Sequence, residues 1–399
     1  MFIMKKILFT VGVLFVSFFF SQSLFGSAGH ILNLDTQGKS PLIKRITIIQ
    51  QEGGRVDWSP SGNNLIAFDK KNADGYYDIY LMDTNGTIVA NLTDGNPNIN
   101  QLHNGNPVWH PFGKYIVFQS EEPQHYNLAN KWPPNPGIGV YNNLWAMTPD
   151  GKKFWKLTNI PIKKNLFDGI ANFGVLNPHF SHDGRKLVWT ERYDDCQTKE
   201  CKWGKWRIKM ADFIDSQNGP YLKNEQIVLQ KCCSKIGFYM TAMGFSLDDK
   251  KILIAGNIDG QDEFGMDQYI FDLTTRHIYN LQNTPQIWEE DCNWTPITNK
   301  IIYMTNEGSP LDFDNPDWYW QHHTREYWLM NNDGSNKTRL TYFNDKDAPE
   351  YIGRDTIVAD SSISPDGKKL VGIIGIDYGD QDKADFELKI VLIEFEKPL

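Results

Sequence analysis

The sequence has no cluster of basic residues. Its 40 Lys and Arg are scattered among 399 residues, and the formal net charge is −9. Proteins that bind nucleic acids concentrate Lys and Arg on one face or along one helix. We therefore expect partners other than nucleic acid.

Motifs for catalysis and cofactor binding are also missing. The sequence has no Cys-x-x-Cys-His motif, so we expect the chain to attach no c-type haem. It also has no nucleophile elbow and no phosphate-binding loop. We expect no cofactor in this chain, and whether it is an enzyme stays open at this point.

Cysteine is scarce, with five residues in the chain. The odd number leaves at least one thiol free or bonded to another chain. Cys196 and Cys201 lack His partners at the spacing of a zinc site, and both fall in one expected loop. We predict a disulfide between them, formed in an oxidising compartment.

Long apolar runs are absent after the first 28 residues. Lys5 and Lys6 precede an apolar run over 7–20, and small residues follow at 26–28. This order is typical of a cleaved signal peptide. A membrane anchor is the alternative, although the run is shorter than the roughly 20 residues of a span. We expect residues 1–28 to be removed, the mature chain to be exported to the periplasm or a similar compartment, and no membrane span to remain.

What the sequence does contain is one unit repeated six times. Each copy has an aromatic or aliphatic residue, a turn related to Ser-Pro-Asp-Gly and a short apolar strand. The six copies begin at Trp58, Trp109, Phe180, Phe245, Trp294 and Ile363. Most copies are followed by a strand, often a tight Asn-Gly or Asp-Gly turn, and a second strand, several of which end in Leu-Thr.

Four antiparallel strands per repeat predict an all-β fold, because sheets of this kind stack radially as propeller blades. We expect a single β-propeller over 29–399, whereas a β-sandwich would not repeat the same turn six times. A lone strand near 43–50 should close the ring as the outer strand of the last blade. Six repeats are visible, and the spacing allows six or seven blades.

Long connections are expected on one face of the propeller. If the strands of a blade are named a to d, the a–b and c–d turns share one face, and the b–c and d–a connections share the other. The long segments are 120–142, 159–177, 191–204, 256–267, 306–325 and 342–360. All of them are b–c or d–a connections. We predict that this face binds partner proteins, since loops on a rigid scaffold carry function.

The segment 256–267 is the first candidate for partner binding. The candidate contact residues are Asp259, Asp262, Glu263, Phe264 and Met266. A loop that only connects two strands has no need of exposed apolar residues, so we expect Glu263 and Phe264 to be the main contacts. A solvated loop without a partner is the alternative.

An aromatic loop is the second candidate. Trp318, Tyr319 and Trp320 are consecutive and lie beside His322 and His323. Exposed aromatic residues at this density are typical of protein interfaces. The alternative is that the long loops simply pack over one another.

Several groups have side chains that bind metals, and each has a simpler structural explanation. The groups are His179 with His182, His322 with His323, and the oxygen-rich segment 69–78 around Gly75. The segment 69–78 resembles part of a calcium loop, but an ordinary hairpin explains it better. The acidic run 289–291 is best explained as solvation at a strand end. Metal binding stays undecided.

The repeats resemble the PD40 repeats of TolB-like propellers. The Ser-Pro-Asp-Gly turn at 364–367, Asp-Ile-Tyr at 78–80 and the Leu-Thr strand ends carry the resemblance, which covers about residues 43–396. The resemblance implies the propeller fold and little about function. We expect the chain to lack the separate N-terminal domain of TolB itself, because the repeats begin near residue 43.

An exported PD40 propeller without a haem motif is also similar to the haem-free propeller subunit of hydrazine synthase. That oxidoreductase condenses nitric oxide and ammonium. This resemblance implies partner subunits that are multihaem cytochromes carrying haem c, a location in the anammoxosome lumen, and seven blades.

Two other functions stay open. Oligogalacturonate lyases use a similar propeller with a metal held by histidines, and residues 303–308 resemble theirs. Asn306, however, stands where that family has His. A TolB-like periplasmic adaptor is the other possibility, and it belongs to the same binding class as a complex subunit.

Overall fold

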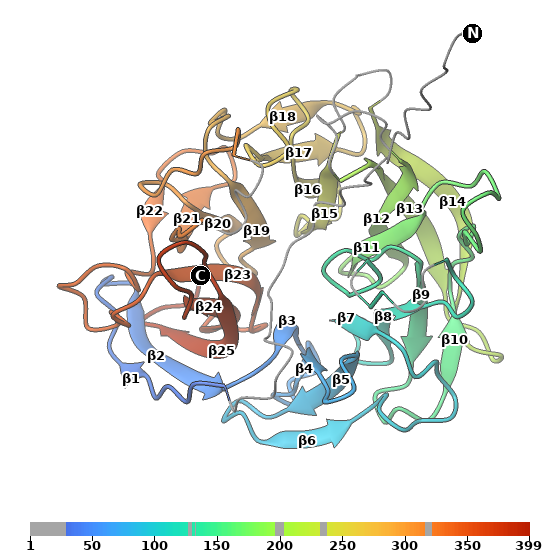
Figure 1. Cartoon of the computed structure of the whole chain (residues 1–399), viewed down its shortest axis with the longest axis horizontal. Coiled ribbons are helices and arrows are strands. Elements are labelled where there is room, and N and C mark those ends of the chain that lie inside the picture. Colours follow the sequence, from blue (N-terminus) through green and yellow to red (C-terminus); the bar gives the residue numbers. More distant parts are fainter. Residues whose placement is uncertain (1–28, 127–129, 132, 196–202, 232–237, 316–320) are drawn as a thin grey trace, which may run out of the picture.

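The computed structural model describes residues 29–126, 130–131, 133–195, 203–231, 238–315 and 321–399. The chain forms six antiparallel sheets arranged radially around one axis, so it is an all-β, six-bladed propeller (Figure 1). The predicted fold class is therefore confirmed, and the blade number is six. No helix in the described part is long and apolar enough to cross a bilayer.

Each of the first three blades has four strands, named here from the ring axis outward. Blade 1 has β3 (Gly54–Trp58), β4 (Ile66–Lys71), β5 (Tyr77–Met82) and β6 (Ile88–Asn91). Blade 2 has β7 (Asn104–Trp109), β8 (Ile116–Glu121), β9 (Asn142–Met147) and β10 (Phe154–Lys156). Blade 3 has β11 (Gly174–Phe180), β12 (Lys186–Asp194), β13 (Lys205–Ile214) and β14 (Tyr221–Gln230).

The other three blades follow the same plan. Blade 4 has β15 (Met240–Phe245), β16 (Lys251–Gly256), β17 (Asp267–Asp272) and β18 (Ile278–Asn280). Blade 5 has β19 (Glu289–Trp294), β20 (Lys300–Thr305), β21 (Glu326–Asn331) and β22 (Thr338–Arg339). Blade 6 has β23 (Thr356–Ile363), β24 (Lys369–Asp377) and β25 (Phe386–Phe395), followed outward by β2 (Ile43–Gln50) and β1 (Asp35–Thr36).

The N-terminal strand β2 closes the ring. It pairs antiparallel with β25, with Ile46 opposite Ile393 and Ile48 opposite Val391. Ile46 is fully buried, so the strand contributes to the core as well as to the ladder. This pairing joins the two ends of the chain and leaves β25 without a free edge.

The repeated turn between the first two strands satisfies its own hydrogen bonds. In blade 6, the Ser364 hydroxyl donates to Asp366 at 2.7 Å and accepts from the backbone N–H of Lys369 at 2.9 Å. Gly367 provides the positive φ of 68° that the turn requires. In blade 4 Asp249 takes this place with φ 56°. These local bonds explain why the turn residues recur in the sequence.

The Leu-Thr ending of the outer strands has an equally local purpose. The Thr93 hydroxyl accepts a hydrogen bond from the N–H of Ile79 and donates to the Asp78 carboxylate at 2.7 Å. Thr158 in blade 2 and Thr341 in blade 5 make the same pair of bonds. The motif thus ties the end of the outer strand to the start of the third strand.

Candidate functional site

The two faces of the disc differ in the length of their connections. The connections between the first and second strands of the blades, on the face called here the turn face, span at most seven residues. The opposite face, called the loop face, carries 122–141, 157–173, 306–325 and 340–355 among its connections. Each innermost strand begins at the loop face. Side chains near the start of an innermost strand therefore lie at the loop face too.

The loop face is charged unevenly. Among the described residues, the connections of blades 4–6 contain fourteen acidic and four basic residues, whereas those of blades 1–3 contain five acidic and four basic residues. The first set consists of residues 257–266, 281–288, 306–325, 340–355, 378–385 and 51–53. The second set consists of residues 72–76, 92–103, 122–141, 157–173, 195–204 and 231–239. We call the first set the acidic half of the loop face.

Each innermost strand departs from regular pairing near its start. The register of β3, β7, β11, β15, β19 and β23 against the second strand shifts in every blade. In five of the strands the irregular stretch contains a residue with positive φ, namely Arg55, Asn106, Asn177, Gly244 and Asp291. Bulges of this kind re-aim side chains, here close to the ring axis.

On one side of the axis the re-aimed side chains form a hydrogen-bonded chain across three blades. The Arg55 guanidinium donates to the buried Asp69 carboxylate at 2.7 Å, and the same oxygen accepts from the N–H of Asn106 at 2.8 Å. The Asn106 amide then donates to the side-chain oxygen of Asn177 at 2.6 Å. A buried charge needs such partners, and the bond from Asn106 to Asp69 joins blade 2 to blade 1.

On the other side of the axis several acids lie close together. Burial, together with the charges of Asp360 and Glu290, raises the pKa of Asp291 well above its usual range. Burial raises the pKa of Glu290 to about 7, although Trp288 Nε1 donates to its carboxylate at 3.0 Å. Arg325 stacks on the Trp288 ring at 3.8 Å. Residues 289–291 lie at the start of β19, but the prediction that they are solvated there is wrong, because Glu289 and Glu290 are buried.

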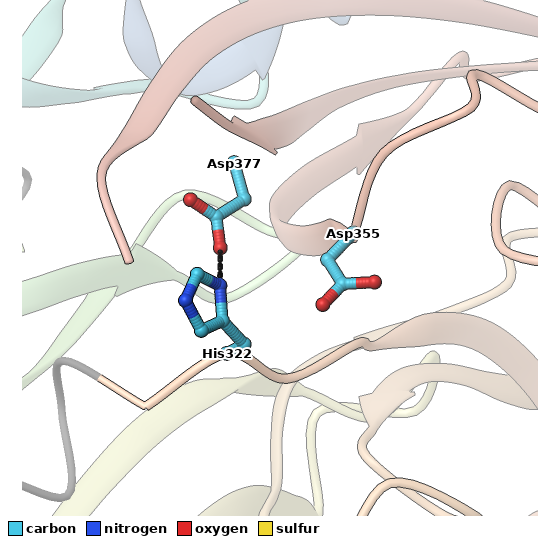
Figure 2. A group of neighbouring side chains, drawn as sticks. All are labelled: His322, Asp355 and Asp377. Carbon is cyan, nitrogen blue, oxygen red and sulfur yellow. Dashed lines mark hydrogen bonds and ion pairs between the residues drawn. The ribbon is translucent and has the colours of Figure 1, made fainter. Parts of the chain in front are cut away.

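One His and two Asp from two connections and the end of β24 meet at the loop face of blades 5 and 6 (Figure 2). His322 Nδ1 lies 2.6 Å from Oδ2 of Asp377, which is the last residue of β24. Asp355 immediately precedes β23, and the ligand atoms of all three residues lie within 4.8 Å of one another. Within the described residues, this is the one group of at least three His, Cys, Asp or Glu whose side-chain atoms are arranged to hold a metal. Burial lowers the pKa of His322, but the hydrogen bond and charge of Asp377 outweigh burial and raise it.

The other groups of metal-binding side chains that the sequence offered are not brought together. His323 is buried, where its Nε2 accepts hydrogen bonds from Arg325, so it does not join His322. Burial lowers the pKa of His179 to about 4, and His182 instead pairs with Asp249 on the turn face at 2.8 Å.

Segment 69–78, which resembles part of a calcium loop, forms the expected hairpin of β4 and β5. The Asn72 amide donates to the Asp78 carboxylate, and Asp69 faces Arg55. Asp74 accepts from the N–H of Tyr76 at 2.9 Å. The oxygen atoms are therefore used within the loop or the core and do not converge.

The prediction of exposed apolar contacts in segment 256–267 is wrong. Phe264 and Met266 are fully buried, and Glu263 is 3% exposed. Phe264 packs against Trp203 and Trp288 in the main core cluster. The apolar residues that the sequence suggested for a partner instead fix the loop to the propeller. Asp259 and Asp262 are exposed.

Two predicted features lie outside the described residues. These are the aromatic loop Trp318, Tyr319 and Trp320, and the disulfide candidates Cys196 and Cys201. Cys292 is described, and it is a free, buried thiol.

An exposed apolar pair on the loop face was not predicted. Leu166 and Phe167 lie between β10 and β11 and are 58% and 91% exposed. Asp168 fixes this turn, since its carboxylate accepts hydrogen bonds from the backbone N–H groups of Lys164 and Asn165. The signal in the sequence was an apolar pair between polar turn residues in a d–a connection.

Comparisons with known proteins identify no specific family. A scan of protein-family models finds no match, and a search of curated proteins finds none at a significant level. Among solved structures, a protein assigned as TolB from Agrobacterium tumefaciens is 12% identical with a TM-score of 0.47, over 86% of this chain and 90% of the other. An oligogalacturonate lyase in complex with manganese is 11% identical with a TM-score of 0.47, over 91% and 96% of the two chains. Similarities at this level carry no argument about activity.

Proposed function

We propose that this chain is a non-catalytic propeller subunit of an exported multi-subunit complex, and that it binds its partner proteins through the loop face. The observation that carries the proposal is the Leu166–Phe167 pair. A Phe side chain that is 91% exposed gains burial free energy only when another molecule covers it. Because Asp168 already fixes the backbone of this turn, little conformational entropy is lost when a partner binds.

The charge of the loop face indicates the kind of partner. The acidic half attracts a protein with a basic surface, and such complementarity mainly increases the rate and the selectivity of association. The apolar pair lies on the other half, next to blades 2 and 3. A partner that covers both halves would have an apolar pocket beside a basic patch.

The resemblance to hydrazine synthase gives this proposal a specific form. In that form the partners are multihaem cytochromes, haem c is carried by them alone, and the compartment is the anammoxosome lumen. The resemblance implies seven blades, whereas this ring has six. The proposal therefore stands on the loop face and does not depend on membership of that complex.

The oligogalacturonate-lyase alternative is disfavoured by the position of Asn306. This residue is fully buried, its side-chain oxygen accepts from the N–H of Trp288 at 2.8 Å, and its amide donates to Ser309 O at 3.0 Å. Asn306 is thus a structural residue that fixes the start of a loop. A TolB-like adaptor remains within the proposed class, because it also acts by binding proteins.

The test compares one exposed Phe on each face. Phe167 lies on the loop face, and Phe112, which is 63% exposed, lies in the turn between β7 and β8 on the turn face. A photo-cross-linking residue is placed at position 167 or 112 in the native host, and F167S and F112S are purified with their complexes. We expect one discrete cross-linked protein from position 167 alone, and at least tenfold less complex with F167S than with F112S. Equal cross-linking from both positions, or full assembly by F167S, would overturn the proposal.

A further inference from the structure

The fold fixes Asp377 in place before any ligand is considered. Its side chain is 4% exposed, and its Oδ1 accepts from the N–H groups of Gly379 at 2.8 Å and Asp385 at 2.9 Å. The other oxygen, Oδ2, is directed at His322 Nδ1. Carboxylates that bind metals are oriented in this way, because hydrogen bonds hold one oxygen and leave the other available to the metal.

The backbone places a second carboxylate beside Asp377. The N–H of Asp377 donates to the carbonyl of Asp355 at 2.9 Å, so the two residues are held at the same level of neighbouring strands. Like charges in such a position repel unless a cation lies between them. Arg354 does not fill this role, because it stacks on Tyr378 at 4.7 Å and donates to the Asp377 carbonyl.

His322 supplies a nitrogen ligand to this pair from a different blade. Its ring is directed at Asp377, as Figure 2 shows, and within the described residues no hydrogen bond reaches the Asp355 carboxylate. One imidazole nitrogen and two carboxylate oxygens suit a borderline divalent ion such as Zn²⁺ or Mn²⁺ better than Ca²⁺, which takes oxygen ligands only. Three protein ligands also leave coordination positions for water or another molecule.

We propose that His322, Asp355 and Asp377 bind one divalent transition-metal ion of the Zn²⁺ class. The ion replaces the proton between His322 Nδ1 and Asp377. The Asp355 carboxylate moves toward the ion and becomes its third ligand. It joins the β20–β21, β22–β23 and β24–β25 connections, which belong to the acidic half of the loop face. The metal therefore fixes part of that half and reduces its negative charge.

The chain provides a matched control for this site. His182 Nδ1 contacts the Asp249 carboxylate at 2.8 Å on the turn face, and no third metal-binding side chain joins that pair among the described residues. H182A therefore removes a His–Asp ion pair without removing the proposed site. D355N removes only the third ligand and leaves the hydrogen bond between His322 and Asp377 in place.

The experiment measures metal binding by the isolated full-length protein after chelator treatment. Zn²⁺ is titrated at pH 7.5 by calorimetry, and Co²⁺ binding is followed by visible absorption, with circular dichroism to check that each variant is folded. We expect one Zn²⁺ per chain, at least tenfold weaker binding for D355N and H322A, and unchanged binding for H182A. A wild-type protein without saturable binding, or a D355N variant that binds like the wild type, would overturn the site. Neither result bears on partner binding through Phe167.

Discussion

The two faces of the propeller are built from the same strands but use their polar residues differently. On the turn face, Ser364, Asp366 and their counterparts in other blades bond to the turn in which they lie. On the loop face and the adjoining ring axis, Asp69 and Asp377 bond to residues far away in the sequence. The repeated residues therefore make the fold, and the residues that differ between blades give the molecule its individual surface.

The difference also has a cost in stability. Buried acids such as Glu289 and Glu290 have raised pKa values because the interior disfavours their charged forms. A protein selected for stability alone has no need of such groups near its axis. These acids near the axis therefore reduce the stability of the folded ring when they are charged.

The largest effect is expected from removing the Asp69 carboxylate. D69A leaves the Arg55 guanidinium buried without its partner, and breaking a buried pair in this way costs about 3–5 kcal/mol. Urea unfolding measured by fluorescence checks the value. R55M/D69A, which removes both charges, should recover much of the loss, and a double variant as unstable as D69A would show that the charge pair is not the cause.

A smaller effect, dependent on pH, is expected from E289Q. The Glu289 carboxyl loses its proton near pH 4.5 when unfolded, whereas burial raises its pKa to about 8 in the folded ring. The folded state therefore binds one more proton between these values, and the stability from that proton is lost as the pH rises toward 8.

E289Q cannot lose this proton, so it should be more stable than the wild type at pH 8, by on the order of 2 kcal/mol, and similar at pH 4.5. Thermal unfolding at both pH values measures the difference. An equal change at both pH values would contradict the raised pKa.

On the turn face, D366A should have a modest effect. Asp366 accepts hydrogen bonds from the Ser364 hydroxyl and the Lys368 N–H in an exposed turn, so its loss should cost about 1 kcal/mol. The free energy of unfolding in urea gives the value. A cost as large as that of D69A would remove the energetic distinction between the two faces.

The smallest effect on stability is expected for exposed acids of the loop face. The triple variant D314N/D347N/D382N should change the free energy of unfolding by less than about 0.5 kcal/mol, since all three residues are exposed. Once cross-linking has identified the partner, the association rate of the triple variant with it can be compared with that of the wild type. The variant should associate severalfold more slowly in low salt and almost as fast in 0.5 M salt. An association rate unchanged in low salt would show that the acidic half does not attract the partner.

The sequence predicted the elements that depend on local chemistry. The Ser-Pro-Asp-Gly turns, the Leu-Thr endings and the strands between them bond within single blades, so their pattern is visible in the residues themselves. The difference in connection length between the two faces could also be predicted, by counting the residues between the expected strands. The spacing of the repeats allows six or seven blades, because the long connections between some copies could hide further strands. The chain before β2 adds only the short strand β1 at the outer edge of blade 6.

The parts that could not be predicted depend on contacts between distant segments. Phe264 lies in a loop, where an apolar residue is expected to be exposed. The sequence alone did not show that Trp203 and Trp288 cover it. The sequence places His322 beside His323, but its partners in space are Asp355, which precedes β23, and Asp377, which ends β24. The bulges near the axis have little sequence signal, because an Asn, Gly or Asp with positive φ marks four of them and Arg55 takes that conformation in blade 1.

The central claim, that the loop face contacts the partner, is tested most directly by carboxylate footprinting. The protein is labelled with a carbodiimide and an amine, free and within its native complex, and modified residues are found by mass spectrometry. We predict protection of Asp259, Asp262 and Asp314 on the loop face, with unchanged labelling of Asp183 and Asp366 on the turn face. Protection of the turn-face residues, with the loop-face residues still labelled, would contradict the account.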